Sequence, residues 1–154
     1  MSTGIFAQGN FQISKDTENG SVVFKGPITF ADLAAEPSFT WFQRNSAYEP
    51  GADAMEVLKN DLSGTRIIVV MGTWCEDSQN LVPRLHTVLS EANFHNVTVY
   101  GVDRTKDALA GEKATYGIER VPTIIVYKED KEVGRIVEVV QKSIEEDLVS
   151  IVMK

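Results

Sequence analysis

The stretch MGTWCEDSQN, residues 71–80, contains the only cysteine of the chain, Cys75, and a serine three positions later, Ser78. It continues the run RIIVVM, residues 66–71, whose β-branched composition is typical of a central strand covered on both faces. The segment that follows, residues 77–94, has apolar residues at helical spacing. The sequence therefore predicts a cysteine where a buried strand meets a helix, and there the unpaired backbone N–H groups favour the thiolate form.

Helices and strands alternate through the rest of the chain from residue 52 onward. The pattern adds the following elements: a helix at 52–62, a strand at 97–103, a polar helix at 105–116, two strands within 121–139 and a helix at 143–154. This alternation predicts an α/β fold with a mixed, mostly parallel central sheet and helices on both faces. The last two strands form an antiparallel C-terminal hairpin.

The first third of the chain has a different character. We expect residues 1–51 to be an N-terminal extension packed on a domain formed by residues 52–154. The first ~20 residues are polar, and they form either a disordered tail or a hairpin between residues 11–14 and 21–24. Two short helices separated by Pro37 follow. Four aromatic side chains are expected to pack this extension: Phe39, Trp41, Phe42 and Tyr48.

Charge and composition limit the kinds of partner. The 154 residues carry a net charge of −7, so nucleic acids and anionic membranes are poor partners on electrostatic grounds. No apolar run is long enough to cross a bilayer, and the N-terminus lacks the features of a signal peptide. One cysteine allows no internal disulfide. We therefore expect a cytoplasmic protein, whose oligomeric state the sequence does not indicate.

Several motifs around this junction and beyond it fit one known family. Trp74 directly precedes Cys75, and Pro83 lies eight residues beyond the cysteine, where thioredoxins carry the proline that kinks the active-site helix. Residues 116–118 (Tyr-Gly-Ile), followed after two residues by 121–124 (Val-Pro-Thr-Ile), match the family's stretch before and through its cis-proline. On these motifs the chain resembles the thioredoxin superfamily, with a Trp-Cys-x-x-Ser (monothiol) active-site motif.

The resemblance implies a thioredoxin-like fold and a role for each motif residue. Cys75 is then the nucleophile of thiol–disulfide exchange, and Ser78 replaces the second cysteine, with a hydroxyl able to donate a hydrogen bond to the sulfur. Pro122 is expected to be a cis-proline that presents the backbone of Val121 to an extended peptide. Trp74 is expected to be a partly exposed wall beside the sulfur.

The departures from the family pattern change the expected mechanism. Ser78 cannot release a mixed disulfide from Cys75, so an external thiol, such as glutathione or a cysteine of a partner protein, must resolve it. Glu76 and Asp77 replace the usual Gly-Pro, and their carboxylates oppose formation of the nearby thiolate. The expected partners are therefore protein or small-molecule thiols and disulfides, with no resident cofactor.

Two other departures leave alternative functions open. Val69 stands where thioredoxins bury an aspartate, and residues 138–139 (Glu-Val) stand where the family has a glycine beside the substrate groove. One alternative is a non-catalytic thioredoxin-fold module that binds a peptide or partner. The other is a glutaredoxin-like, glutathione-binding monothiol protein. It is disfavoured because residues 135–138 (Arg-Ile-Val-Glu) replace that family's Gly-Gly-x-x-Asp.

The remaining polar residues are given structural interpretations. His86 and His95 match no zinc-binding spacing, so we predict no metal site and expect both at the surface or at a helix end. The pair Glu145 and Glu146 is expected on the solvated face of the last helix.

Overall fold

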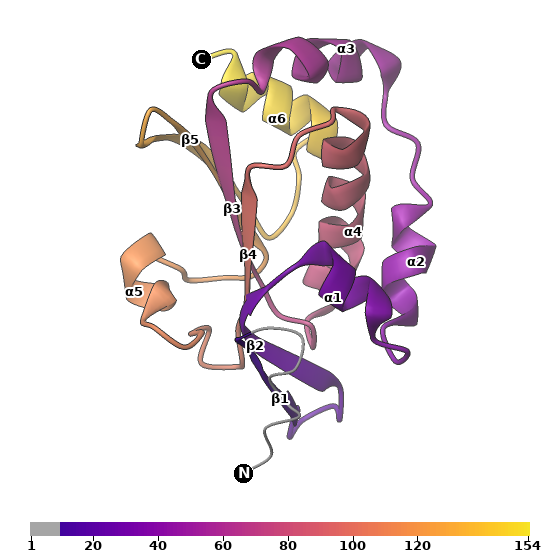
Figure 1. The fold of residues 1–154 in the computed structure, drawn as a ribbon, viewed down its shortest axis with the longest axis vertical. Helices are drawn as coiled ribbons and strands as arrows, with labels where there is room; N and C mark the ends of the chain where they lie inside the picture. Colours follow the sequence, from indigo (N-terminus) through magenta and orange to yellow (C-terminus); the bar gives the residue numbers. More distant parts are fainter. Residues whose placement is uncertain (1–9) are drawn as a thin grey trace.

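A computed structural model describes residues 10–154. Twelve elements follow one another along this part of the chain. They are β1 (Gln12–Lys15), β2 (Val22–Ile28), α1 (Phe30–Ala35), α2 (Thr40–Ser46), α3 (Ala52–Asp61), β3 (Thr65–Met71), α4 (Glu76–Glu91), β4 (Val97–Gly101), α5 (Glu112–Tyr116), β5 (Thr123–Lys128), β6 (Lys131–Val137) and α6 (Ile144–Val152). Figure 1 shows how these elements surround a twisted sheet.

The sheet is mixed, as expected, but the share of parallel pairs is smaller than the sequence pattern predicts. Its strand order is β1-β2-β4-β3-β5-β6, and within the described residues only β3 and β4 pair in parallel. The difference arises because β5 pairs antiparallel with β3 and because β2 of the N-terminal extension pairs antiparallel with β4, with Gly26 opposite Gly101. A Cβ atom at position 101 would overlap the carbonyl oxygen of Phe24, so glycine permits this close approach of the two strands.

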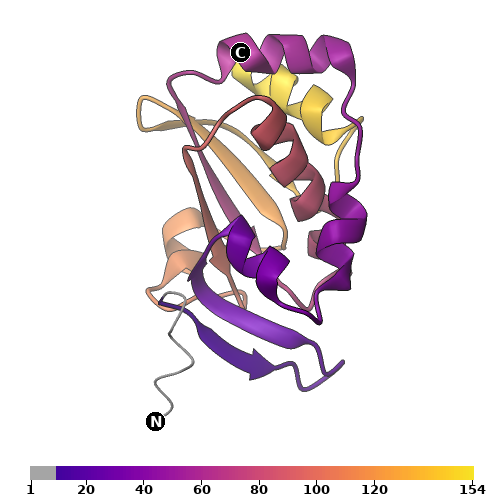
Figure 2. The same cartoon turned by 45° about the vertical axis from the view of Figure 1, so that its right-hand side comes forward.

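Helices cover both faces of the sheet unequally. In Figures 1 and 2, α1, α2, α4 and α6 lie on one side of the sheet and α5 lies on the other. Successive side chains of β3 point to opposite faces of the sheet, so this strand contributes to the hydrophobic core on each face. Ile67, Val69 and Met71 join the larger core, and Ile68 and Val70 join the smaller one. The β-branched run at 66–71 is thus the expected central strand with two buried faces.

The N-terminal extension contributes strands as well as helices. β1 and β2 form the hairpin, with Gln12 opposite Lys25 and Lys15 opposite Val22, and each strand begins one residue later than expected. The expected alternative, a disordered tail, falls partly on residues 1–9, which lie outside the described residues. Aromatic side chains of the extension contact one another at tilted or edge-on angles, with ring centroids 5.0 Å apart for Phe24–Phe39, 4.9 Å for Phe39–Trp41 and 6.2 Å for Trp41–Phe42.

Two local expectations are wrong. Of the polar helix expected at 105–116 only α5 forms, because Gly111 adopts a left-handed conformation (φ 77°) at its N-cap. Glu145 is only 4% exposed, unlike Glu146, because its carboxylate accepts hydrogen bonds from the Tyr48 hydroxyl at 2.7 Å and from the Gly51 N–H at 2.8 Å. Burial and this carboxylate raise the pKa of Tyr48 to about 12. The pair links the extension to α6.

Candidate thiol site

Cys75 lies at the N-cap of α4, directly after the loop that follows β3. Its backbone is extended (φ −102°, ψ 123°), and its side chain is half-buried. The thiol donates a hydrogen bond to the carbonyl oxygen of Val121, with an Sγ–O distance of 3.6 Å. The peptide bond between Val121 and Pro122 is cis. The fold therefore places the sulfur beside the loop that precedes β5, although 46 residues separate the two.

Ser78 does not contact the sulfur in the expected way. Its side chain is fully buried, and its hydroxyl oxygen accepts a hydrogen bond from the Gly72 N–H at 3.1 Å. Among residues 10–154 no hydrogen bond joins Ser78 to Cys75. This hydrogen bond connects the first turn of α4 to Gly72, in the loop that follows β3. Its contact is with the loop that carries the cysteine.

Trp74 is buried, and the expectation of a partly exposed wall is wrong. Only 9% of the residue is exposed, and its indole N–H donates a hydrogen bond to the carbonyl of Val102 at 2.7 Å. A Cβ atom built on Gly72 would lie 2.6 Å from the indole ring, so the absence of a side chain there makes room for the ring. The indole belongs to the smaller core.

An arginine beyond the motif covers this indole. The guanidinium carbon of Arg104 lies 4.4 Å from the centroid of the Trp74 ring. Its Nε and Nη2 donate to the two carboxylate oxygens of Asp16, at 2.9 and 3.0 Å. The hydrogen bonds from Arg104 outweigh burial and lower the pKa of Asp16 to about 2. The same carboxylate raises the pKa of Arg104, and the nearby Cys75 adds a smaller contribution in the same direction.

The β1–β2 hairpin contacts the thiol loop directly as well. Asn19 donates a side-chain hydrogen bond to the carbonyl of Trp74 at 3.1 Å. The hydroxyl of Thr73 donates to the carbonyl of Val22 at 2.7 Å and accepts from the N–H of Phe24 at 3.3 Å. The sequence alone did not indicate Asn19 or Thr73, because no sequence pattern shows which segment an N-terminal turn will contact in the folded protein.

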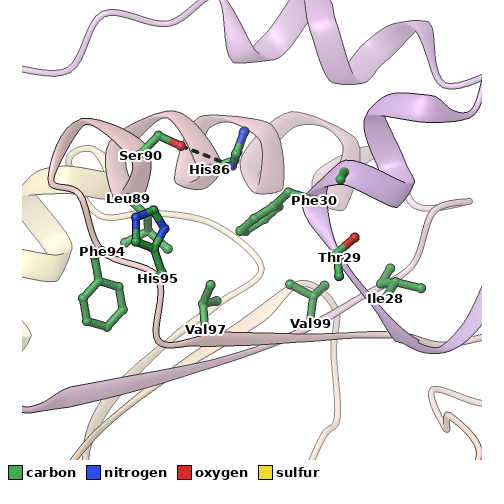
Figure 3. A pocket seen from close by; sticks show the side chains of 11 residues that line it. Ile28, Thr29, Phe30, His86, Leu89, Ser90, Phe94, His95, Val97 and Val99 are labelled. Atoms are coloured by element: carbon green, nitrogen blue, oxygen red, sulfur yellow. Dashed lines mark hydrogen bonds between the residues drawn. The ribbon is translucent and has the colours of Figure 1, made fainter. Parts of the chain in front are cut away.

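Both histidines lie at a pocket away from the thiol site. Figure 3 shows a pocket of about 280 Å³ whose lining includes His86, Ser90, Phe30 and His95. His95 is exposed as expected, but His86 is half-buried, with its ring centroid 4.5 Å from that of Phe30 and 5.6 Å from that of Phe42. Burial lowers the pKa of His86. No group of three or more potential metal-ligating side chains occurs in residues 10–154.

Comparison with known proteins identifies the family. The thioredoxin family profile matches residues 54–153, which is most of the chain. The chain belongs to the thioredoxin family. A search of curated proteins found no match.

Solved structures share this thioredoxin-like fold at low sequence identity. A protein of unknown function from Pseudomonas aeruginosa is 18% identical and has a TM-score of 0.56, over 79% of this chain and 76% of that one. An HIV epitope-scaffold is 18% identical, with a TM-score of 0.54, over 74% and 73%. A mutant thioredoxin from Halobacterium salinarum is 17% identical, with a TM-score of 0.41, over 68% and 83%. The family profile and the first two of these structures together establish the fold.

The thioredoxin motif positions that depart from the pattern have their own contacts here. Glu138, where the sequence comparison expects glycine, adopts the left-handed conformation (φ 71°). Its N–H donates to the carbonyl of Pro122 at 2.7 Å, and its carboxylate pairs with Arg120 at 3.5 Å. The next residue, Val139, is 61% exposed. An ion pair and an exposed apolar side chain therefore occupy the position where thioredoxins have a glycine.

Proposed function

We propose that this protein performs monothiol thiol–disulfide exchange through Cys75. The observation that carries the proposal is the position of the sulfur: it is half-buried at the N-cap of α4 and 3.6 Å from the Val121 carbonyl in the loop before β5. Exchange requires the thiolate form of Cys75, and the sulfur lies at the end of α4 where the backbone N–H groups lack helical partners. Membership in the thioredoxin family supports the same chemistry.

The first step makes a mixed disulfide. The Cys75 thiol first loses its proton to solvent, and its bond to the Val121 carbonyl is broken. The thiolate then attacks one sulfur of a substrate disulfide, a new S–S bond forms, and the substrate S–S bond breaks. The departing thiolate takes up a proton. The substrate has gained one free thiol, and Cys75 is held in the mixed disulfide.

The second step requires a thiol from outside the chain. Position 78 holds a serine whose hydroxyl is buried and bonded to the Gly72 N–H, and the chain has no other cysteine than Cys75. An external thiolate attacks the mixed disulfide, which releases the Cys75 thiolate and leaves the incoming sulfur in a new disulfide. Glutathione or a cysteine of a partner protein can fill this role. A reducing, cytoplasmic compartment would supply such thiols.

The substrate is proposed to bind through its backbone. The main chain of Val121 lies within reach of the sulfur, so an extended peptide that pairs with it would bring its disulfide to Cys75. Trp74 contributes no surface to this contact because Arg104 covers it. The surface beside the groove is formed instead by the exposed Val139 and the ion pair of Arg120 with Glu138.

Intact-mass analysis tests the proposal. The native protein is incubated with oxidised glutathione and then with reduced glutathione, and its mass is recorded after each step. We expect one glutathionyl adduct that reduced glutathione removes completely. The Cys75→Ser variant is the control and must gain no adduct. An adduct that forms only in denaturant would refute exchange by the folded protein.

A binding module without chemistry makes the opposite prediction for this variant. In that case Cys75→Ser retains both partner binding and cellular function, because the fold and the Val121 main chain are intact. Under the exchange mechanism the variant loses function, and the natural protein traps its substrate as a mixed disulfide when external thiols are withheld. Within residues 10–154 no helix has the length and apolar character to cross a membrane.

A further inference from the structure

We propose that Arg104 is a positioning residue of the thiol site, held in place by Asp16 of the N-terminal hairpin. In this arrangement Arg104 keeps Trp74 turned into the protein and thereby fixes the loop that carries Cys75. The inference deepens the proposed function and rests on it only for the effect on exchange. The contacts of Arg104 with Asp16 and with Trp74, which we call the clamp, can be tested without any disulfide chemistry.

The anchor of the clamp is the Asp16 carboxylate. The side chain of Asp16 is only 2% exposed, whereas that of Arg104 is 38% exposed. Besides the paired bonds from Arg104, the carboxylate accepts the N–H groups of Glu18 at 3.1 Å and Asn19 at 2.8 Å. A buried carboxylate with four donors and a two-pronged arginine contact is an organised site, unlike a mobile surface ion pair.

The other side of the arginine fixes the indole. Its guanidinium carbon lies over Trp74, 4.4 Å from the ring centroid. The edge of the indole is bonded to Val102, and Gly72 leaves the space that the ring fills. Because Trp74 is bonded covalently to Cys75, the direction of the indole constrains the backbone that presents the sulfur.

The clamp is an addition to the thioredoxin-family core. The family profile begins at residue 54, so Asp16 and the hairpin lie outside it. Asn19 and Thr73 provide two further contacts between the hairpin and the loop. The hairpin therefore reaches the thiol loop through both side chains and main chain, and Arg104 is its link to the indole.

The charge of Arg104 does not explain this arrangement. Asp16 neutralises the guanidinium, and the carboxylate of Glu18 lies 3.3 Å from its Nη1. The three side chains together carry a net charge of −1, and the two carboxylates already pair the guanidinium. The role left to Arg104 is geometric, and this separates it from a residue that activates the thiol.

Tryptophan fluorescence tests the clamp. Trp41 is the only other tryptophan, and a Trp41→Phe background leaves Trp74 as the sole indole. Acrylamide quenching is measured for Arg104→Gln and Asp16→Asn in this background. We expect the quenching constant to rise roughly two- to fivefold in both variants, because an uncovered indole meets solvent. Arg104→Lys keeps the positive charge but lacks the planar guanidinium, so its quenching constant should lie between those of the parent protein and Arg104→Gln.

The matched control is Arg66→Gln. Arg66 also lies over an aromatic ring, that of Tyr127 at 4.3 Å, and also has a carboxylate partner, Asp130 at 3.6 Å. It stands at the opposite end of β3 from the thiol loop. Its loss should leave the quenching of Trp74 unchanged. Equal quenching in Arg104→Gln and the parent protein, or an equal rise in the control, would overturn the proposal.

A second label keeps the test usable if the Trp41→Phe background fails to fold. The protein is then labelled with 5-fluorotryptophan at both indoles, and Trp41 serves as an internal reference for the fold in 19F spectra. We expect Arg104→Gln to shift the Trp74 resonance and leave that of Trp41 in place. Shifts of both, or of neither, would contradict a local clamp.

The effect on exchange has its own signature. In Arg104→Gln the rate of glutathione adduct formation should fall severalfold at its high-pH plateau, while the midpoint of the pH–rate profile stays fixed. A moved midpoint with an unchanged plateau would show that Arg104 acts by charge, against the proposal. If the parent protein forms no adduct at all, the exchange function fails, and the fluorescence result still decides the clamp.

Discussion

Replacing Ser78 with alanine removes one hydrogen bond at the centre of the thiol site. The hydroxyl of Ser78 is fully buried and accepts the Gly72 N–H at 3.1 Å. Alanine fits the same space, so the change creates little strain. It leaves the N–H of Gly72 buried without its partner, and that loss sets the cost.

The expected cost is about 1–3 kcal/mol in the free energy of unfolding. In a protein of this size each kcal/mol corresponds to a fall in Tm of about 2–4 °C. Urea unfolding and calorimetry both measure the change. The matched control is Ser90→Ala on the same helix, whose side chain is exposed and whose loss should cost less than about 0.5 kcal/mol.

Adduct formation at Cys75 separates two roles for the serine. Since Ser78 is bonded to Gly72 and not to the sulfur, its removal should change the rate of glutathione adduct formation far less than it changes stability. A collapse of that rate with no loss of stability would show that the hydroxyl acts on the sulfur directly. That result would refute the structural reading of Ser78.

The other predictions concern three different parts of the molecule. Because burial lowers the pKa of His86 from 6.5, protons bind the unfolded chain more tightly, and stability should fall as the pH drops below about 6.5. His86→Phe should remove that component in urea titrations at several pH values, with the exposed His95→Phe as the matched control. Gly72→Ala places a Cβ 2.6 Å from the indole and should cost about 1–3 kcal/mol, together with a changed tryptophan emission. Glu145→Ala leaves the Tyr48 hydroxyl without its acceptor and should cost about 2–4 kcal/mol by calorimetry, whereas Glu145→Gln should cost less.

The sequence predicts best where local pattern and burial agree. The run at 66–71 contains four consecutive β-branched residues, and the structure gives the strand two buried faces. The helix expected at 77–94 forms as α4, with Cys75 at its N-cap. In both cases the residues that decide the element lie within it, so the period of the apolar residues suffices.

Long-range polar contacts could not be predicted in the same way. Arg104 and Asp16 are 88 residues apart, and Glu145 is 97 residues from Tyr48. Asp16, Arg104 and Glu145 are common surface types, so composition alone assigns them to solvent. The turn from Asp16 to Asn19 has a recognisable local signature, but its outward partner depends on the finished fold.

The direction of β2 also escaped the sequence pattern. The apolar pattern of a strand is the same whether its neighbour runs parallel or antiparallel. The hairpin with β1 reverses the chain before β2 reaches β4, and Gly101 permits the close approach of β2 and β4. Alternation of helices and strands from residue 52 onward could not supply this information.

Strand β2 also decides where this protein can be shortened. A chain that starts at residue 54, where the family profile begins, would lose Phe24 and Ile28 from the hydrophobic interior. It would also strip β4 of its outer neighbour and leave an unprotected edge able to pair with other chains. The segment that matches the family is therefore shorter than the segment needed for folding. A chain truncated at residue 54 should aggregate.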